Sequence, residues 1–151
     1  MTTKVDAVCL ALTSLWQGAA ALDGVTVVDS AQANADSSPE WLWVAHDGDV
    51  PDDGNELITA EQSWMAFNKV KQENADITCA AVVVSGDISI PTVRARANAI
   101  ISAAEDALRT DPTLGGLVMQ ASLTSLRYFQ NVSTAGAKVR AVFTVTYLAQ
   151  L

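Results

Sequence analysis

The chain has 151 residues, half of them apolar and 17% charged, which suits one domain and is too hydrophobic for a disordered protein. Nine Lys and Arg against 17 Asp and Glu give a net charge of −8. This disfavours sequence-specific nucleic-acid binding, which needs cations to replace phosphate counterions. Residues 5–68 hold eleven acids and no Lys or Arg, whereas residues 112–151 hold three bases and no acid. Such polarity fits a molecule that stacks or forms rings with charged neighbours, although an acidic surface also serves solubility.

The first half of the chain predicts one helix and four strands. Apolar residues recur at spacings of three and four over residues 3–21, which indicates an amphipathic helix that ends near Asp23-Gly24. Short strands are expected at 25–28 and 40–45, joined by a small polar linker. Residues 57–71 alternate imperfectly and favour a strand paired with the next one at 77–85, the most apolar β-type run.

The second half predicts a long helix and a hairpin. The helix begins near Ser89 or Thr92, with Pro91 in or near its first turn, and ends at Asp111-Pro112. Strands at 117–129 and 137–149 are joined by a turn at residues 133–136. The whole order predicts an α+β fold: a mainly antiparallel sheet with two helices packed on one face, in a single domain over residues 1–151.

The chain offers little material for catalysis or for a metal. His46 is its one histidine, and it is either a general base or, as we prefer, a solvated loop residue, because no nucleophile motif accompanies it. In the acidic loop that follows, a calcium-binding loop would have to start at Asp49. Gly54 then falls on the sixth position, but Pro51 and Ala60 occupy two ligand positions. We therefore predict a solvated acidic turn, no enzyme, no metal and no cofactor.

Other conspicuous residues have structural interpretations. Trp41 and Trp43 share one face of a strand and are either core or partner surface. Cys9 and Cys79 are expected to be buried thiols in a reducing cytoplasm, and no segment is long and apolar enough to span a membrane. Three arginines of the second helix are expected to form a solvated face: Arg94, Arg96 and Arg109.

An ordered series of segments resembles the tail terminator (tail completion) proteins of long-tailed phages of actinobacteria. The series starts with the strand and acidic loop at 40–49 (EWLWVAHDGD), continues with EQSW at 61–64, DITC at 76–79 and SGD at 85–87, and then follows the second helix. There it includes RARA at 94–97, AAEDALR at 103–109 and DPTLGG at 111–116, and it closes with GAKVRAVFTV at 136–145. The resemblance covers nearly the whole chain, and the order of the segments carries it.

The resemblance implies a structural virion protein. Such proteins form a hexameric ring that caps the tail tube, ends tube polymerisation and presents its other face to the head-side connector. The implied partners are further copies of the chain as a homo-hexamer, the major tail tube protein and the connector or stopper protein. Genome DNA would pass through the ring without sequence-specific binding. The implied location is the tail-neck region of the virion, after assembly in the host cytoplasm and without a membrane.

Three alternatives stay open at this point: a head-tail stopper or other minor neck protein, an enzyme that uses His46, and a binding module for a host protein. For the ring, we expect the acidic loop at 47–56 to contact a basic partner surface or to face the channel, where its negative charge would keep DNA from adhering. The acidic loop of one subunit could also meet the basic strands of the next. The expected interface residues are Asp47, Asp49, Asp52, Asp53, Glu56, Trp64, Arg127, Lys138 and Arg140.

Overall fold

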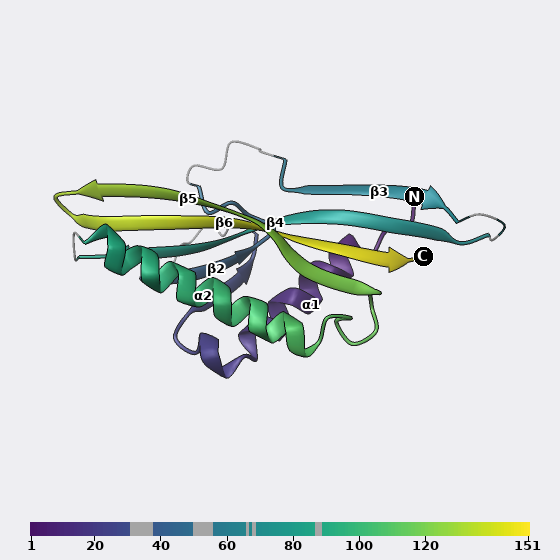
Figure 1. Cartoon of the computed structure of the whole chain (residues 1–151), viewed down its shortest axis with the longest axis horizontal. Helices are drawn as coiled ribbons and strands as arrows, with labels where there is room; N and C mark the ends of the chain where they lie inside the picture. The colour runs from purple at the N-terminus through teal and green to yellow at the C-terminus, as the bar shows by residue number, and fades with distance from the viewer. Residues whose placement is uncertain (31–37, 50–55, 66, 68, 87–88) are drawn as a thin grey trace.

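The computed structural model describes residues 1–30, 38–49, 56–65, 67, 69–86 and 89–151. Over these residues it contains two α-helices, a short 3-10 helix and six strands, shown in Figure 1. In chain order the elements are α1 (Val5–Gln17), η1 (Ala20–Leu22), β1 (Thr26–Asp29), β2 (Glu40–Val44), β3 (Ile58–Trp64), β4 (Lys71–Ser85), α2 (Ile90–Thr110), β5 (Gln120–Ser133) and β6 (Gly136–Gln150).

The six strands form one sheet. The order of neighbours is β1, β2, β4, β6 and β5, and β3 also pairs with β4. Only β1 and β2 are parallel to each other among the described pairs; the others are antiparallel. One edge of β4 pairs with β6, so its other edge carries two neighbours in succession, β3 along 71–77 and β2 along 80–83. The predicted α+β fold with a mainly antiparallel sheet is confirmed.

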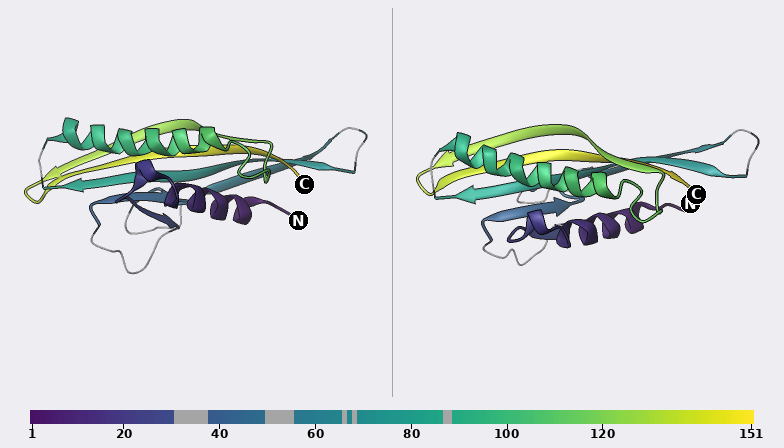
Figure 2. Two further views of the ribbon diagram at one scale, coloured as in Figure 1. Left: turned by 90° about the horizontal axis from the view of Figure 1, so that it is seen from below. Right: turned by 60° about the horizontal axis from the view of Figure 1, so that its bottom comes forward.

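Alternation along β4 and β6 divides the sheet into two faces. On one of them, which we call the helix face, the odd-numbered residues of both strands join the buried side chains of α1 and α2 in one core cluster. Trp16 of α1 donates its indole N–H to the Ala104 carbonyl of α2 at 3.0 Å and packs edge-on against Phe143 of β6, with ring centroids 5.9 Å apart. In Figure 2, α2 runs along the strands while α1 lies closer to β1 and β2. The helix stripe predicted from the sequence is buried: Val93, Ala97, Ile100, Ile101, Ala104 and Leu108.

The opposite face, which we call the open face, has its own small apolar cluster. Trp41 and Trp43 stack with ring centroids 5.0 Å apart and planes 15° apart. They pack with Ala80, Val82 and Val142, and each tryptophan is no more than 7% exposed. Of the two interpretations open from the sequence, the structure therefore assigns both tryptophans to a core within the chain.

The main difference from the predicted elements lies between residues 57 and 77. This stretch contains the short strand β3, a turn, and the first part of β4, which begins at Lys71 rather than near residue 77. The Met65 N–H donates to the Val70 carbonyl at 3.0 Å and closes the hairpin. We call this β3–β4 hairpin the arm, because it projects past both termini in Figure 2. The first part of β4 was not predicted because residues 71–76 are mostly polar and only alternate side chains there are buried.

A buried carboxylate joins the arm to the body. Glu73 is fully buried and accepts hydrogen bonds from the Tyr147 hydroxyl at 2.6 Å, the Gln62 amide at 2.8 Å and the Lys4 backbone N–H at 3.0 Å. Burial alone would raise the pKa of Glu73, but hydrogen bonds from Tyr147, Thr3, Lys4 and Gln62 outweigh it and hold the pKa below its usual value. Folding therefore favours the charged form of this side chain.

Candidate partner-binding surface

The acidic segment that follows β2 turns back over the open face. Ala45 has a positive φ of 55°, and Gly48 has a φ of 73°, so the backbone bends twice within four residues. At Gly48 a Cβ atom would lie 2.7 Å from Val82 Cγ2 and 3.2 Å from both Ala80 Cβ and Arg140 Cδ. Glycine is required here both by its φ and by the close approach of the backbone to the sheet. The first part of the acidic segment is thus built onto the strands.

Arg140 of β6 holds this segment in place. Its Nη1 donates to the Asp47 carbonyl at 2.8 Å, and its Nη2 lies 3.9 Å from the Asp49 carboxylate. The guanidinium also stacks over Phe129, 4.2 Å from the ring centroid. Because the Arg140 side chain is only 15% exposed, its bond to the Asp47 carbonyl is screened little by water and salt, whereas the Asp49 carboxylate is 56% exposed and its attraction to Arg140 is screened more. One residue of the basic end of the chain therefore binds the acidic segment of the same chain.

His46 is buried rather than solvated, so the sequence-based interpretation of this residue is wrong. It is 1% exposed, its ring lies against Trp43 with centroids 4.9 Å apart, and its Nδ1 accepts the Gly48 N–H at 2.8 Å. Its Nε2 is buried and has no hydrogen-bond partner within the described residues. Packing against Trp43 and the backward turn at Gly48 take the ring out of water. The imidazole fixes the loop and presents no nitrogen to solvent.

The basic residues of the last two strands share the open face with this segment. Arg127 pairs with Val142 in the ladder and Lys138 with Asn131, which puts both side chains on the same face as Arg140. A hollow of about 340 Å³ lies between the acidic segment and two of them, Arg127 and Arg140. Six of its lining residues are Asp47, Asp49, Glu56, Arg127, Phe129 and Arg140. The two charged elements expected from the sequence to meet between subunits already meet inside one chain.

The remaining predicted interface residues lie elsewhere. Trp64 is at the far end of β3 from Glu56, is 66% exposed, and stacks with Lys71, whose Nζ is 5.0 Å from the ring centroid. Asp52 and Asp53 lie outside the described residues. The structure therefore separates the predicted set into a charged cluster on the open face and an aromatic residue at the end of the arm.

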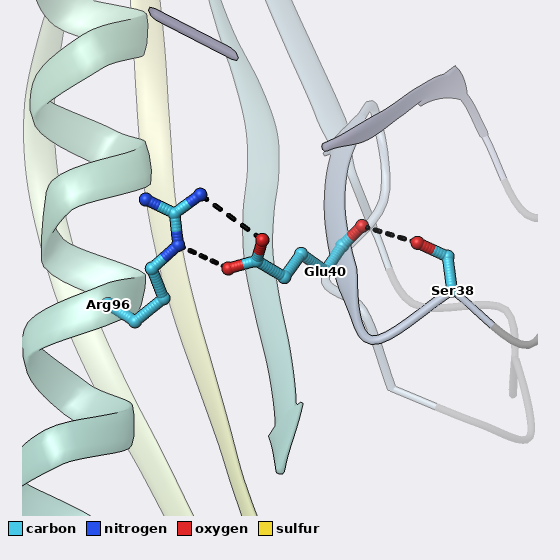
Figure 3. A network of polar contacts seen from close by, with 3 residues as sticks. All are labelled: Ser38, Glu40 and Arg96. Atoms are coloured by element: carbon cyan, nitrogen blue, oxygen red, sulfur yellow. Dashed lines mark hydrogen bonds and ion pairs between the residues drawn. The ribbon is translucent and has the colours of Figure 1, made fainter. Parts of the chain in front are cut away.

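The arginines of α2 pair with polar neighbours instead of forming a purely solvated face. Arg96 binds both carboxylate oxygens of Glu40 at the start of β2, as Figure 3 shows. This contact raises the pKa of Arg96. Arg94 donates to the side chain of Gln130 at 2.9 Å, and Arg109 pairs with the helix neighbour Glu105 at 3.0 Å. The contacts of Arg96 and Arg94 join α2 to β2 and to the edge strand β5, and the sequence spacing gave no signal for these two. The pair of Arg109 and Glu105 lies within the helix.

The structure offers no other evident chemical site within its described part. Those residues include no group of three or more His, Cys, Asp or Glu side chains that could hold a metal ion. Cys9 and Cys79 are both buried, as predicted, and burial raises the pKa of each thiol to about 12. No helix in the described ranges is long and apolar enough to cross a membrane.

Comparison with known proteins gives a likeness of fold. No protein-family model and no curated protein sequence matches the chain. Among solved structures, the chain is similar to a chain of the virion of a native gene transfer agent particle, with a TM-score of 0.53 and 11% identity. The match covers 98% of this chain and 98% of the other. The whole chain thus shares its fold with a component of a virion particle.

Proposed function

We propose that this chain is a structural virion protein of the tail terminator type. In this proposal it forms a hexameric ring on the end of the tail tube, stops further polymerisation and joins the tail to the head-side connector. The observation that carries the proposal is the likeness in fold, over 98% of both chains, to a chain of a virion particle. The ordered sequence resemblance to tail terminators supports the more specific role.

An exposed sheet edge supports contacts between copies. β5 is 14 residues long and stands at the end of the strand order. Among the described strands none pairs with its outer edge, and an unpaired edge is a template for further contacts. Four large apolar side chains of β5 are 37–51% exposed: Leu126, Tyr128, Phe129 and Val132. Burial of such side chains between subunits would favour a ring over separate copies.

The role of the ring is steric and electrostatic in this proposal, with no catalytic step. The acidic segment at 47–56 has five acids in ten residues, and its first part is fixed on the open face by Arg140. Fixed negative charge of this kind would attract a basic partner surface, or would keep DNA from adhering if the segment faces the channel.

Charge removal tests this electrostatic role. Replacing Asp47, Asp49, Asp52 and Asp53 by Asn should impair tail joining or genome passage. The Asp47 carboxylate accepts the Asp49 N–H at 2.9 Å, and an Asn side-chain oxygen can accept the same bond. The fold should therefore persist while the charge is lost. Infectious particles in normal yield would contradict the role.

A matched control separates this effect from the general loss of acidity. Asp6 and Asp23 are both exposed and lie at the two ends of the α1–η1 segment. Changing these two to Asn is compared with the double variant Asp47→Asn, Asp49→Asn, because each pair of substitutions removes the same charge. The control pair should leave infectivity unchanged, because the proposal assigns it to no contact with another virion protein.

The absence of catalysis is also testable. In His46→Asn, the side-chain oxygen can replace Nδ1 as acceptor for the Gly48 N–H, while the imidazole is removed. We expect His46→Asn particles to assemble and infect normally. A folded variant that assembles but loses infectivity would favour a chemical role for the ring.

The proposed role predicts the amount of the chain in particles. Quantitative mass spectrometry of purified virions should find about six copies per particle, as a single closed ring requires. A binding module for a host protein would instead be absent from purified particles.

A further inference from the structure

The end of the arm exposes large apolar side chains. We define the arm tip as Trp64, Met65, Phe67, Lys69 and Lys71. Phe67 is fully exposed, Trp64 is 66% exposed and Met65 is 38% exposed. Three large apolar side chains are thus exposed within four positions of one turn, and exposed apolar groups that gather in one place mark interaction sites more often than scattered surface residues do.

The backbone conformation of the tip is energetically unfavourable as well. Phe67 has a φ of 67°, a left-handed conformation that is strained for a bulky side chain. The Phe67 side chain is fully exposed, so burial within the described structure does not offset this strain. Two internal contacts nevertheless order the hairpin: the Met65 N–H donates to the Val70 carbonyl, and Lys71 stacks on Trp64. A strained and exposed aromatic residue on an ordered hairpin is accounted for if it is buried against a partner.

Charge indicates which partner fits. Lys69 and Lys71 lie at the tip, whereas the chain as a whole has a net charge of −8. The rest of the chain is therefore even more acidic than that figure, and a second copy offers the tip an attractive, negatively charged surface.

A complementary hollow lies between the end of α2 and the start of β5. Its volume is about 390 Å³, and Leu108, Pro112, Ala121 and Leu123 give it a partly apolar lining. Glu105 and Arg109, which pair with each other, also line it. The C-terminal end of α2 adds the negative end of the helix dipole. Near this end three acids outnumber one base: Glu105, Asp106 and Asp111 against Arg109. A partly apolar hollow beside a helix end of net negative charge suits an apolar tip that carries two lysines.

We propose that the arm tip of one copy inserts Phe67 into the α2–β5 hollow of the next copy. This inference rests on the proposed ring and specifies one of its contacts. Tip and hollow are different surfaces of the same chain, so the contact is head-to-tail, the kind that closes into a ring when the rotation between copies allows it. The lysines of the tip would then face the acids at the end of α2.

Disulfide trapping tests the contact directly. The two native thiols are buried and their pKa values are raised to about 12, so they react slowly near neutral pH. In a chain with Phe67→Cys and Gln120→Cys, disulfide formation across the contact should produce a ladder of covalent multimers when concentrated protein is oxidised. Each single variant can give dimers at most. Gln120 is exposed at the rim of the hollow.

The matched control is Phe67→Cys with Ala95→Cys, because Ala95 is exposed on the same helix near its other end. We expect a ladder from the Gln120 pair that reductant removes, and none beyond dimers from the Ala95 pair. Equal ladders from both pairs, or a ladder from neither, would overturn the proposal.

A second variant separates this contact from the proposed virion role. Phe67→Asn tolerates a positive φ better than Phe, so it should fold with unchanged or higher Tm and yet lose incorporation into particles. Normal incorporation of Phe67→Asn would overturn the contact and leave the virion role standing. Absence of the unmodified chain from particles would overturn the virion role, while the disulfide ladder would still decide the contact. Loss of incorporation without a ladder would assign the tip to a different virion protein and overturn the contact between copies.

Discussion

Replacing Gly48 by Ala perturbs the point where the acidic segment rests on the open face. A left-handed conformation costs an L-residue roughly 1–2 kcal/mol, and Gly48 has a φ of 73°. The added Cβ would also lie 2.7 Å from Val82 Cγ2. Crowding of this kind in a packed region costs about 1–3 kcal/mol. Together these terms predict a loss of about 2–5 kcal/mol in the free energy of unfolding.

Gly24 supplies the control. It has a φ of 83° and no atom within 4 Å of an added Cβ, so Gly24→Ala incurs only the backbone cost of roughly 1–2 kcal/mol. For a domain of this length, 1 kcal/mol changes Tm by about 2–4 °C. Gly48→Ala should therefore lower Tm by about 4–20 °C and Gly24→Ala by about 2–8 °C. The difference between the two variants measures the contact with the sheet.

Thermal unfolding followed by circular dichroism gives both Tm values, and urea titration followed by tryptophan fluorescence gives the free energies. The fluorescence of Trp43, which packs against His46, should change in the native state of Gly48→Ala and not in that of Gly24→Ala. Equal losses of stability in the two variants, with unchanged native fluorescence, would refute the argument that the acidic segment is built onto Val82.

Three further predictions follow from individual contacts. Because the pKa of Glu73 is lowered in the folded state, its contribution to stability is present above its unfolded pKa of about 4.3 and is lost as pH falls through the folded value. Urea titrations across this range should show a flatter pH dependence in Glu73→Gln, and identical slopes would contradict this. Arg140→Gln should lose about 1–3 kcal/mol of stability, since it removes a charge-assisted bond to the Asp47 carbonyl; a loss near zero would count against that bond. Arg96→Gln should lose no more than about 1 kcal/mol of stability, because Arg96 is 44% exposed where it pairs with Glu40. Thermal unfolding checks both arginine variants. A larger loss of stability in Arg96→Gln would contradict the partial screening of this ion pair by solvent.

Local periodicity explains why most elements could be predicted. The spacing of three and four between Val93, Ala97 and Ile100 is the pattern of a helix with one buried stripe, and the alternation from Val139 to Tyr147 is that of a strand with one buried face. Such patterns require no knowledge of what covers the buried side. The first part of β4 was missed because its residues are largely polar and one of its two carboxylates, Glu73, is buried through distant partners.

The candidate site depends on contacts that no local pattern encodes. Arg140 is 93 positions from Asp47, and the register of β6 against β4 and β5 decides that its side chain faces the acidic segment. His46 was expected to be solvated because it follows a strand in a polar stretch. Its burial requires the segment to cross the sheet at Gly48, a path that depends on Val82 and Ala80.

The sequence does contain one indication of the exposed arm tip. Phe67 lies in the short segment between Trp64 and two lysines, where a turn would ordinarily favour Gly, Asn or Asp. A large aromatic residue at such a position indicates a contact outside the chain. The sequence does not reveal that the turn projects past the termini, because this depends on the register in which β3 pairs with residues 71–77 of β4.

The location of the chain in the particle tests the central claim most directly. Electron cryomicroscopy of purified particles that carry a labelled copy of the chain should place one ring of about six copies at the head-proximal end of the tail tube. Label within the neck above that end would favour a stopper or other minor neck protein, and particles without label would contradict the virion role.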